Sequence, residues 1–282
     1  MLRSFISRAT STAARLVESH PHVWSLAWQA VHKFPFLLPH DISYRALRHF
    51  IALKPEGLFL DIGANDGISA LSFRKFSKSY RILSLEPNPI LEPALRKLKV
   101  ADSRFDYRMT GVGVRHGTMK LFVPTYKNIV LHTFSSGDRN AVLKTVAESF
   151  GPSVARSVTV TSFDCEIVAG DDLNVDPAII KIDAEGFDCA VLEGLTATID
   201  RGRPFVVIEI GAGSYHSIKA YFEGRGYRLL AYSPPTDKFR IAPESWDARS
   251  YETPGYRNFF AVPVEMQKSL PFEEAVAVAD HD

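Results

Sequence analysis

Cysteine, net charge and long apolar runs are all scarce in this sequence of 282 residues. Its two cysteines, Cys165 and Cys189, are too few for a disulfide framework or a cysteine-based metal site, so we expect packed thiols in a reducing compartment. The formal net charge of +1 supplies no general field that would hold nucleic-acid phosphates. No apolar run approaches the roughly 18 residues that a membrane-spanning helix requires. These absences predict a soluble protein with no nucleic-acid partner and no integral membrane contact.

The N-terminal region is basic and rich in aromatic residues. Residues Met1 to Val17 contain three arginines, several serines and threonines, and no acid. That composition fits either a mitochondrial transit peptide or a basic amphipathic first helix, and we favour the helix and a cytoplasmic location. Two helical patterns follow, divided by the proline-containing segment Phe34 to Pro39. We therefore expect a helical extension over residues 1–54, whose five histidines lack the paired spacing of a metal site and are expected at the surface.

From Leu58 onward, short apolar runs alternate with helical patterns, which is typical of βαβ units in a parallel sheet. The expected strands are Leu58 to Ile62, Arg81 to Leu85, Ile179 to Asp183 and Phe205 to Ile210, with Tyr227 to Tyr232 and Arg257 to Val262 as a closing antiparallel pair. The expected helices are Ile68 to Phe76, Pro89 to Lys99, Phe187 to Ile199 and Tyr215 to Gly224. We assign residues 55–263 to one α/β domain and 264–282 to a tail. Residues from about 120 to 159 form an insertion with a hairpin, a Ser-rich loop and a short helix, placed to cover the ligand edge of the sheet.

The segment after the first strand carries the features of a cofactor loop. Ligands of open parallel sheets bind beyond the carboxyl ends of the strands, and Asp61 to Gly67 occupies that place. Gly63 and Gly67 allow tight turns and close approach of the backbone to a ligand. Glu86 ends the second expected strand and can accept hydrogen bonds from both ribose hydroxyls of an adenosine cofactor. We include Ala64, Asn65 and Asn88 among the candidate cofactor-binding residues.

Three interpretations of this loop are open: it binds a nicotinamide dinucleotide, it binds S-adenosylmethionine, or its aspartates have a structural role. A nicotinamide dinucleotide calls for G-x-G-x-x-G, whereas the sequence has G-A-N-D-G and lacks the middle glycine. Asp61 and Asp66 would repel a pyrophosphate but attract the sulfonium and ammonium of S-adenosylmethionine, which is therefore the favoured cofactor. The alternative role for the two aspartates is to cap the helix that follows.

Five segments in order, FLDIGANDGISALSF, SLEPNP, TSFD, IIKIDAEGFDCAVLEGL and PFVVIEIG, resemble the FkbM family of methyltransferases. The resemblance implies a class I, Rossmann-like fold with a mostly parallel seven-stranded sheet flanked by helices, and transfer of methyl to a hydroxyl of a sugar or secondary metabolite. It also implies that Asp61, Gly63 and Gly67 form the donor loop and that Glu86 binds the ribose. The TLD-like element of the family is Ser162-Phe163-Asp164 here, and this departure leaves the role of Asp164 open.

The segment Lys181-Ile182-Asp183 is physically unusual, because a central parallel strand is buried on both faces and charged residues there need partners or a ligand. Alternation places Lys181, Asp183 and, if the chain stays extended, Glu185 on one side, where they can border the donor pocket. The alternative is an ion pair at the sheet end without a chemical role. Glu209 ends the next strand and can face substrate or pair with Lys181.

Removal of a proton from an acceptor hydroxyl requires a base within hydrogen-bond reach. The candidate catalytic residues are Asp183, Glu185, Lys181 and His132, the last in the loop Val130 to Ser136. A divalent metal bound by Asp183, Glu185 and Glu209 is a variant that we do not favour.

The expected acceptor is a small molecule or glycan, with Trp246, Tyr251 and Tyr256 as a possible sugar platform or as ordinary loop packing. The rival functions are a catalytically silent binding or assembly protein of the same fold and a nicotinamide-dependent reductase. The sequence does not fix the oligomeric state.

Overall fold

The computed structural model describes residues 20–23, 25–26, 40–211, 213–245 and 258–273. The basic N-terminal segment, the proline-containing break at Phe34 to Pro39 and the candidate platform residues Trp246, Tyr251 and Tyr256 lie outside the described residues.

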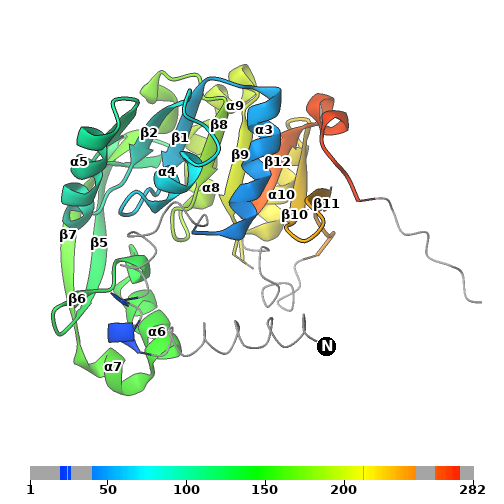
Figure 1. The fold of residues 1–282 in the computed structure, drawn as a ribbon. Coiled ribbons are helices and arrows are strands. Elements are labelled where there is room, and N and C mark those ends of the chain that lie inside the picture. The colour runs from blue at the N-terminus through cyan, green and yellow to red at the C-terminus, as the bar shows by residue number, and fades with distance from the viewer. Residues whose placement is uncertain (1–19, 24, 27–39, 212, 246–257, 274–282) are drawn as a thin grey trace, which may run out of the picture.

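A large mixed β-sheet forms the centre of an α/β fold (Figure 1). Its order is β11-β10-β12-β9-β8-β1-β2-β3. The bounds are β1 Leu58–Ile62, β2 Arg81–Leu85, β3 Phe105–Arg108, β8 Ile179–Ile182, β9 Phe205–Glu209, β10 Tyr227–Ser233, β11 Lys238–Ile241 and β12 Asn258–Pro263. Strands β3, β2, β1, β8 and β9 pair in parallel, and β12 lies antiparallel between β9 and β10. The α/β prediction and the closing antiparallel pair are confirmed.

The expectation of seven strands needs correction, because the described sheet has eight. The additional edge strand β11 pairs antiparallel with β10, and the turn between them includes Asp237 at φ +57°. In the sequence this strand lies within a polar loop. Its pattern, with Phe239 buried and Ile241 half-exposed, is too short to indicate a strand without its neighbour.

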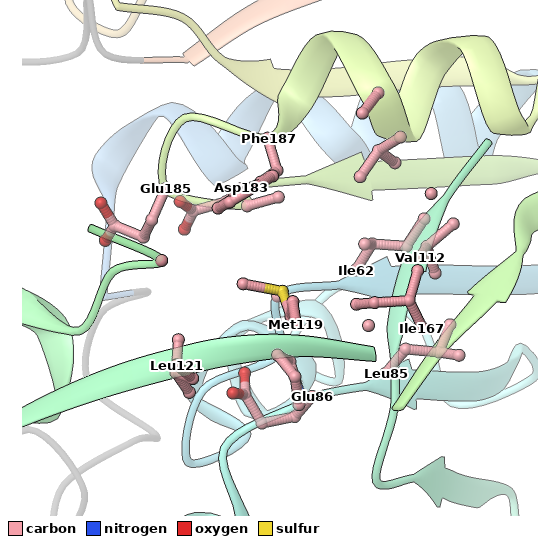
Figure 2. A pocket seen from close by; sticks show the side chains of 18 of the residues that line it. Ile62, Leu85, Glu86, Val112, Met119, Leu121, Ile167, Asp183, Glu185 and Phe187 are labelled. Atoms are coloured by element: carbon pink, nitrogen blue, oxygen red, sulfur yellow. The ribbon is translucent and has the colours of Figure 1, made fainter. Parts of the chain in front are cut away.

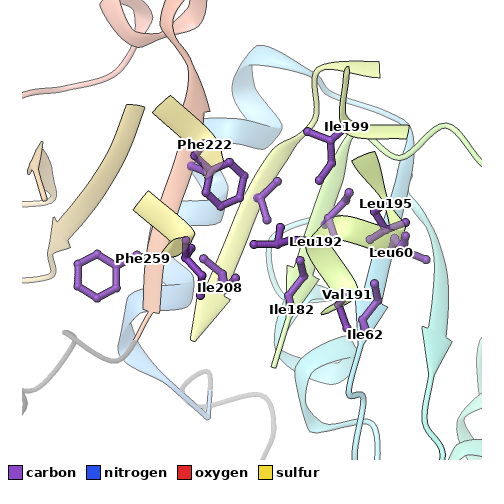
Figure 3. Packing of buried hydrophobic residues seen from close by; sticks show 14 of the residues in the cluster. Leu60, Ile62, Ile182, Val191, Leu192, Leu195, Ile199, Ile208, Phe222 and Phe259 are labelled. Atoms are coloured by element: carbon purple, nitrogen blue, oxygen red, sulfur yellow. The ribbon is translucent and has the colours of Figure 1, made fainter. Parts of the chain in front are cut away.

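Helices cover both faces of the large sheet. One face carries η1 (Ile42–Ala46), α3 (Leu47–Leu53), α4 (Ile68–Phe73), η2 (Pro89–Leu91) and α5 (Glu92–Ala101). The other carries α8 (Asp188–Gly194), α9 (Thr196–Gly202) and α10 (Tyr215–Glu223). Figure 3 shows the second core, where Leu60 and Ile62 of β1 meet Val191, Leu192 and Leu195 of the helical layer. Because side chains alternate along β1, Phe59 and Asp61 face the opposite layer.

A second, smaller sheet has the order β4-β7-β5-β6 and extends away from the large one (Figure 1). Its bounds are β4 Gly111–Gly113, β5 Gly117–Tyr126, β6 Ile129–Val130 and β7 Val158–Ala169. Strands β5 and β7 form a long antiparallel ribbon, and η3 (His132–Phe134), α6 (Arg139–Phe150) and α7 (Pro152–Ser157) lie between β6 and β7 in sequence. The hairpin β5–β6 and helix α6 correspond to the expected insertion. Strand β7 was not expected, because its polar residues and mostly incomplete burial leave no apolar run.

The first residues after the large sheet pack back onto it. After η6 (Val264–Ser269), Leu270 is buried, and the N–H of Phe239 in β11 donates to the carbonyl of Pro271 at 2.8 Å. None of the helices in the described ranges is long and apolar enough to cross a membrane.

Candidate functional site

A cavity of about 330 Å³ lies at the carboxyl ends of the parallel strands. Its walls come from the loop after β1, the end of β2, strands β4 and β5, the region of η3 and the loop between β8 and α8. Asp183 and Glu185 lie at one end, and apolar side chains including Ile62, Val112 and Ile167 gather at the other (Figure 2). This is the place where open parallel sheets bind their ligands.

The β1–α4 loop takes its shape from two glycines with positive φ. Gly63 has φ +73°, and a Cβ there would lie 1.8 Å from the carbonyl oxygen of Asp183. Gly67 has φ +88°, and its Cβ would lie 2.2 Å from Cδ1 of Leu98 in α5. Glycine therefore lets the loop lie directly against the end of β8 and lets α4 begin against α5. Gly63 and Asn65 line the cavity.

Glu86 presents a buried carboxylate at the cavity wall. The N–H of Asn65 donates to its Oε2 at 2.7 Å, and the N–H of Asn88 donates to its Oε1 at 2.9 Å. Burial raises the pKa of Glu86 to about 7, and these two backbone hydrogen bonds oppose the rise. A carboxylate has about four acceptor positions, so two remain for a ligand in the cavity.

Four of the candidate cofactor residues lie around the loop without lining the cavity: Asp61, Ala64, Gly67 and Asn88. Asp61 is fully buried and accepts hydrogen bonds from Ser69 Oγ at 2.6 Å and Ser84 Oγ at 2.8 Å. It therefore joins β1, β2 and α4. The Asn88 side chain accepts a hydrogen bond from the N–H of Ile90 at the start of η2. Of these four residues, Asn88 contacts Glu86 directly, through its backbone N–H.

Lys181 joins the ends of β1 and β8. Its buried ammonium donates to the carbonyl of Gly63 at 2.6 Å and of Ile62 at 3.3 Å. Burial lowers its pKa, but Asp183 at 3.4 Å and Asp61 at 3.6 Å outweigh that effect, so the pKa is raised. The ammonium stays charged and does not line the cavity, so the geometry favours the expected alternative of an ion pair at the sheet end.

Asp183 and Glu185 both line the cavity, although the chain does not stay extended between them. Strand β8 ends at Ile182, and Glu185 has φ +47°. Glu185 is an exposed residue, but the surrounding protein, followed by the charges of Asp183 and Glu209, raises the pKa of its carboxyl. Two carboxyl groups therefore lie together at this end of the cavity.

His132 lies in η3 on the cavity wall, as expected for a loop over the site. Its side chain is 11% exposed, and its Nε2 lies 3.9 Å from Oδ2 of Asp66 in the β1–α4 loop. Ser135 and Ser136 line the same wall. The insertion thus contributes directly to the site.

The family model described as Methyltransferase FkbM domain matches residues 61–229, which include the β1–α4 loop, Glu86 and the β8–α8 loop. The chain belongs to the FkbM methyltransferase family. The FkbM resemblance drawn from the sequence segments is confirmed. A search of curated proteins finds no match.

Several solved structures are similar to this FkbM chain. A methyltransferase FkbM from Methylobacillus flagellatus KT is 16% identical with a TM-score of 0.42, over 73% of this chain and 43% of that one. A precorrin-6y C5,15-methyltransferase from Geobacter metallireducens GS-15 is 12% identical with a TM-score of 0.38, over 77% and 83% of the two chains. A probable spermidine synthase from Corynebacterium glutamicum ATCC 13032 is 12% identical with a TM-score of 0.38, over 86% and 84%. The chain spans less than half the length of the Methylobacillus structure.

The apolar part of the FkbM cavity was not expected from the sequence. Leu85, Val112, Met119, Leu121, Ile167 and Val191 come from four different strands and one helix. Phe187, which is 41% exposed, packs so closely on Gly137 that a Cβ there would lie 2.7 Å from its ring. The one feature of the sequence that pointed to Phe187 was its position directly after the segment Lys181 to Gly186.

Asp164, whose role the sequence left open, lies on the exposed surface of the β5–β7 ribbon. It pairs there with Lys120 at 2.8 Å and does not line the cavity. Within the described ranges no three His, Cys, Asp or Glu side chains are grouped so that they could hold a metal ion.

Proposed function

We propose that this FkbM protein is an S-adenosylmethionine-dependent O-methyltransferase that acts on a hydroxyl of a sugar, glycan or secondary metabolite. The observation that carries the donor assignment is the buried Glu86 carboxylate, which faces the cavity with two acceptor positions left by its backbone hydrogen bonds. Those positions suit the two hydroxyls of a ribose. Gly63 and Asn65 bring the backbone to the same wall, and the apolar part suits an adenine ring.

The charges around the loop favour a cationic donor over a dinucleotide. Asp66 lies in the β1–α4 loop, Glu86 lies beside it, and Asp183 and Glu185 lie at the other end of the cavity. Four carboxyl groups would repel a pyrophosphate, whereas S-adenosylmethionine supplies an electrophilic methyl group on a positively charged sulfur. We propose that Asp61, Ala64, Gly67 and Asn88 act as positioning residues for this site.

An acceptor hydroxyl loses a proton as its oxygen receives the methyl group, and three cavity residues are placed to take it. Asp183 and Glu185 offer carboxylate oxygens at one end of the cavity. His132 offers an imidazole nitrogen from η3. The raised pKa of Glu185 makes its carboxylate a stronger base than an ordinary one. We propose that one of these three groups is the general base and that Lys181 holds Asp183 in place.

Titration calorimetry with S-adenosylmethionine and S-adenosylhomocysteine tests the donor assignment. We expect binding of both and at least a tenfold loss of affinity in Glu86→Ala, because each unmade hydrogen bond to a charged group weakens binding by about 1.5–3 kcal/mol. Glu148→Ala is the matched control, since Glu148 is exposed on α6 and pairs with Lys144 one turn earlier in the same helix. Binding of NADH in place of these ligands would support a reductase, and no binding of any of them would support a silent assembly protein.

Asp183→Asn, Glu185→Gln and His132→Gln test the general base. Each variant is incubated with saturating donor and candidate glycan fractions, and methylated product is measured by mass spectrometry. Loss of the base should lower the turnover about 10²- to 10⁴-fold while donor affinity changes little. A residue whose replacement leaves the rate unchanged is not the base.

A further inference from the structure

Phe187 is an exposed aromatic side chain on the wall of the cavity. It is 41% exposed, whereas core rings such as Phe50 and Phe222 are fully buried. Among the exposed large hydrophobic side chains of the described residues, it is the one aromatic. A single apolar side chain on an outer surface needs no explanation, but one that lines a ligand cavity contacts whatever binds there.

A tight turn between β8 and α8 fixes the place of Phe187. Glu185 has φ +47° and Gly186 has φ +94°, so the chain passes through two left-handed residues before α8 begins. The N–H of Phe187 donates to the carbonyl of Ala184 at 3.1 Å, and the N–H of Ala184 donates to Oδ1 of Asp188 at 2.9 Å. The turn therefore keeps Phe187 on the cavity wall and out of both cores of the large sheet.

The insertion supports the tip of the Phe187 ring from the other side. A Cβ at Gly137 would lie 2.7 Å from Cζ and 3.0 Å from Cε2 of Phe187, and 3.3 Å from Cε of Met119. The ring tip therefore lies against the backbone of Gly137, which follows Ser135 and Ser136 on the cavity wall. The position of the ring thus depends on two segments, the β8–α8 loop and the insertion.

Phe187 lies at the end of the cavity that carries two of the proposed general bases. Figure 2 shows it at the same end as Asp183 and Glu185, with Val112 and Ile167 at the other end. The hydroxyl that receives the methyl group must lie within hydrogen-bond reach of its base. The part of the acceptor next to that hydroxyl therefore lies near Phe187, whereas the opposite, apolar end suits the adenine of the donor.

An aromatic ring beside carboxylates and serine hydroxyls suits a saturated ring that bears hydroxyls. The face of a Phe ring carries partial negative charge and attracts the slightly positive C–H groups on the face of a saturated ring. The hydroxyls at the rim of such a ring can donate to carboxylate oxygens and exchange hydrogen bonds with serine hydroxyls. An open-chain alcohol has the same hydroxyls but lacks the face of C–H groups.

Resting on the proposed function, we propose that Phe187 is a specificity-determining residue that binds the methyl acceptor. One face of a saturated, hydroxylated ring packs on Phe187, and a hydroxyl at the rim then lies within reach of Asp183 or Glu185. Ring acceptors are therefore bound more tightly than open-chain alcohols with the same substituents. Gly137 sets the position of the aromatic ring, because a side chain there would displace it.

The test compares ring and open-chain members of three pairs: glucose with sorbitol, galactose with galactitol, and mannose with mannitol. Binding to the full-length protein is measured by saturation-transfer NMR with saturating S-adenosylhomocysteine, and catechol is included as an aromatic alcohol. We expect at least one sugar to bind about five times more tightly than its alditol, with the strongest transfer to C–H protons of one ring face. Phe187→Leu keeps an apolar side chain but no aromatic face, so it should remove that preference and leave the affinity for S-adenosylhomocysteine unchanged. Val264→Ala, at a residue that is 44% exposed outside the cavity, should change neither.

Gly137→Ala keeps the test decisive if Phe187→Leu fails to fold. Gly137 has no positive φ, and the nearest atoms to its new methyl group belong to the tip of a side chain that can rotate. This variant should bind the preferred sugar about threefold more weakly, whereas Gly117→Ala, whose methyl group meets open space, should bind it normally.

Equal affinities within every pair, or no binding of any sugar, overturn the inference while leaving the proposed function in place. Tighter binding of catechol than of every sugar also overturns it, because the cavity then selects an aromatic acceptor. An equal loss of sugar and S-adenosylhomocysteine affinity in Phe187→Leu has the same consequence, because the side chain then belongs to the donor site. Failure of S-adenosylhomocysteine itself to bind would refute the proposed function, and the inference with it.

Discussion

Replacement of Gly63 by alanine should push the β1–α4 loop away from the end of β8, beside the proposed donor site. The new methyl carbon would lie 1.8 Å from the carbonyl oxygen and 2.8 Å from the carbonyl carbon of Asp183. Both atoms belong to the backbone, so no side-chain rotation can relieve the contact. The loop must move away from the end of β8, and the 2.6 Å hydrogen bond from Lys181 to the Gly63 carbonyl must lengthen or break.

Two terms determine the size of the effect. Gly63 has φ +73°, and an L-residue in this left-handed region costs about 1–2 kcal/mol. Overpacking of a closely packed site typically costs a further ~1–3 kcal/mol. The free energy of unfolding should therefore fall by about 2–5 kcal/mol, and donor binding should be lost because Gly63 lines the cavity.

Two other glycines separate these terms. Gly151 has φ +90° and ψ 160°, a conformation that is almost restricted to glycine, with open space around its Cβ position, so Gly151→Ala should show a conformational cost alone, about 1–3 kcal/mol. Gly117 has open space and no positive φ, so Gly117→Ala should change stability by less than about 1 kcal/mol. Urea unfolding gives the stabilities, and calorimetry with S-adenosylhomocysteine gives the affinities. The reasoning is refuted if Gly63→Ala binds normally and loses no more stability than Gly151→Ala.

Three further expectations concern the core, the ribose carboxylate and metals. Phe50 is fully buried with its ring centroid 4.4 Å from that of Phe205, so Phe50→Ala should cost about 3–5 kcal/mol in urea unfolding, against less than ~0.5 kcal/mol for the exposed Val100→Ala. The pKa of Glu86 is raised to about 7, and its ionised form is the better acceptor for ribose hydroxyls. Donor affinity measured by calorimetry should therefore fall as the pH drops below 7, by up to about tenfold per unit, and a midpoint near 7 that persists in Glu86→Gln would contradict this assignment. Since Lys181 already pairs with Asp183, chelation should leave methyl transfer intact; a loss of product that magnesium restores would show a metal requirement.

The sequence predicted which segments of the chain meet at the site. The apolar runs at β1, β2, β8 and β9 are buried strands, and their carboxyl ends meet at one edge because the strands are parallel. For that reason the glycine-containing loop, Glu86 and Asp183 come together although 122 residues separate the first strand's Asp61 from Asp183. The resemblance to FkbM methyltransferases rested on these same local segments.

The sequence was less informative about the direction in which each side chain points. Asp61 was expected at the donor, yet it faces Ser69 and Ser84 on the opposite side of β1 from Ile62, which lines the cavity. Lys181 was a catalytic candidate, yet its ammonium is directed toward the Gly63 carbonyl. In both cases the partner lies on another strand or helix, so the composition of the motif alone did not show which groups were already paired.

The sequence by itself determined the central strands, the position of the glycine-containing loop and the family, because each depends on residues that lie close together along the chain. Only the tertiary structure decided the apolar half of the cavity. Strands β5 and β7 pair Gly117 with Ile167 across a separation of 50 residues and have few fully buried side chains. Such contacts follow from how the layers pack, which no local pattern of residues records.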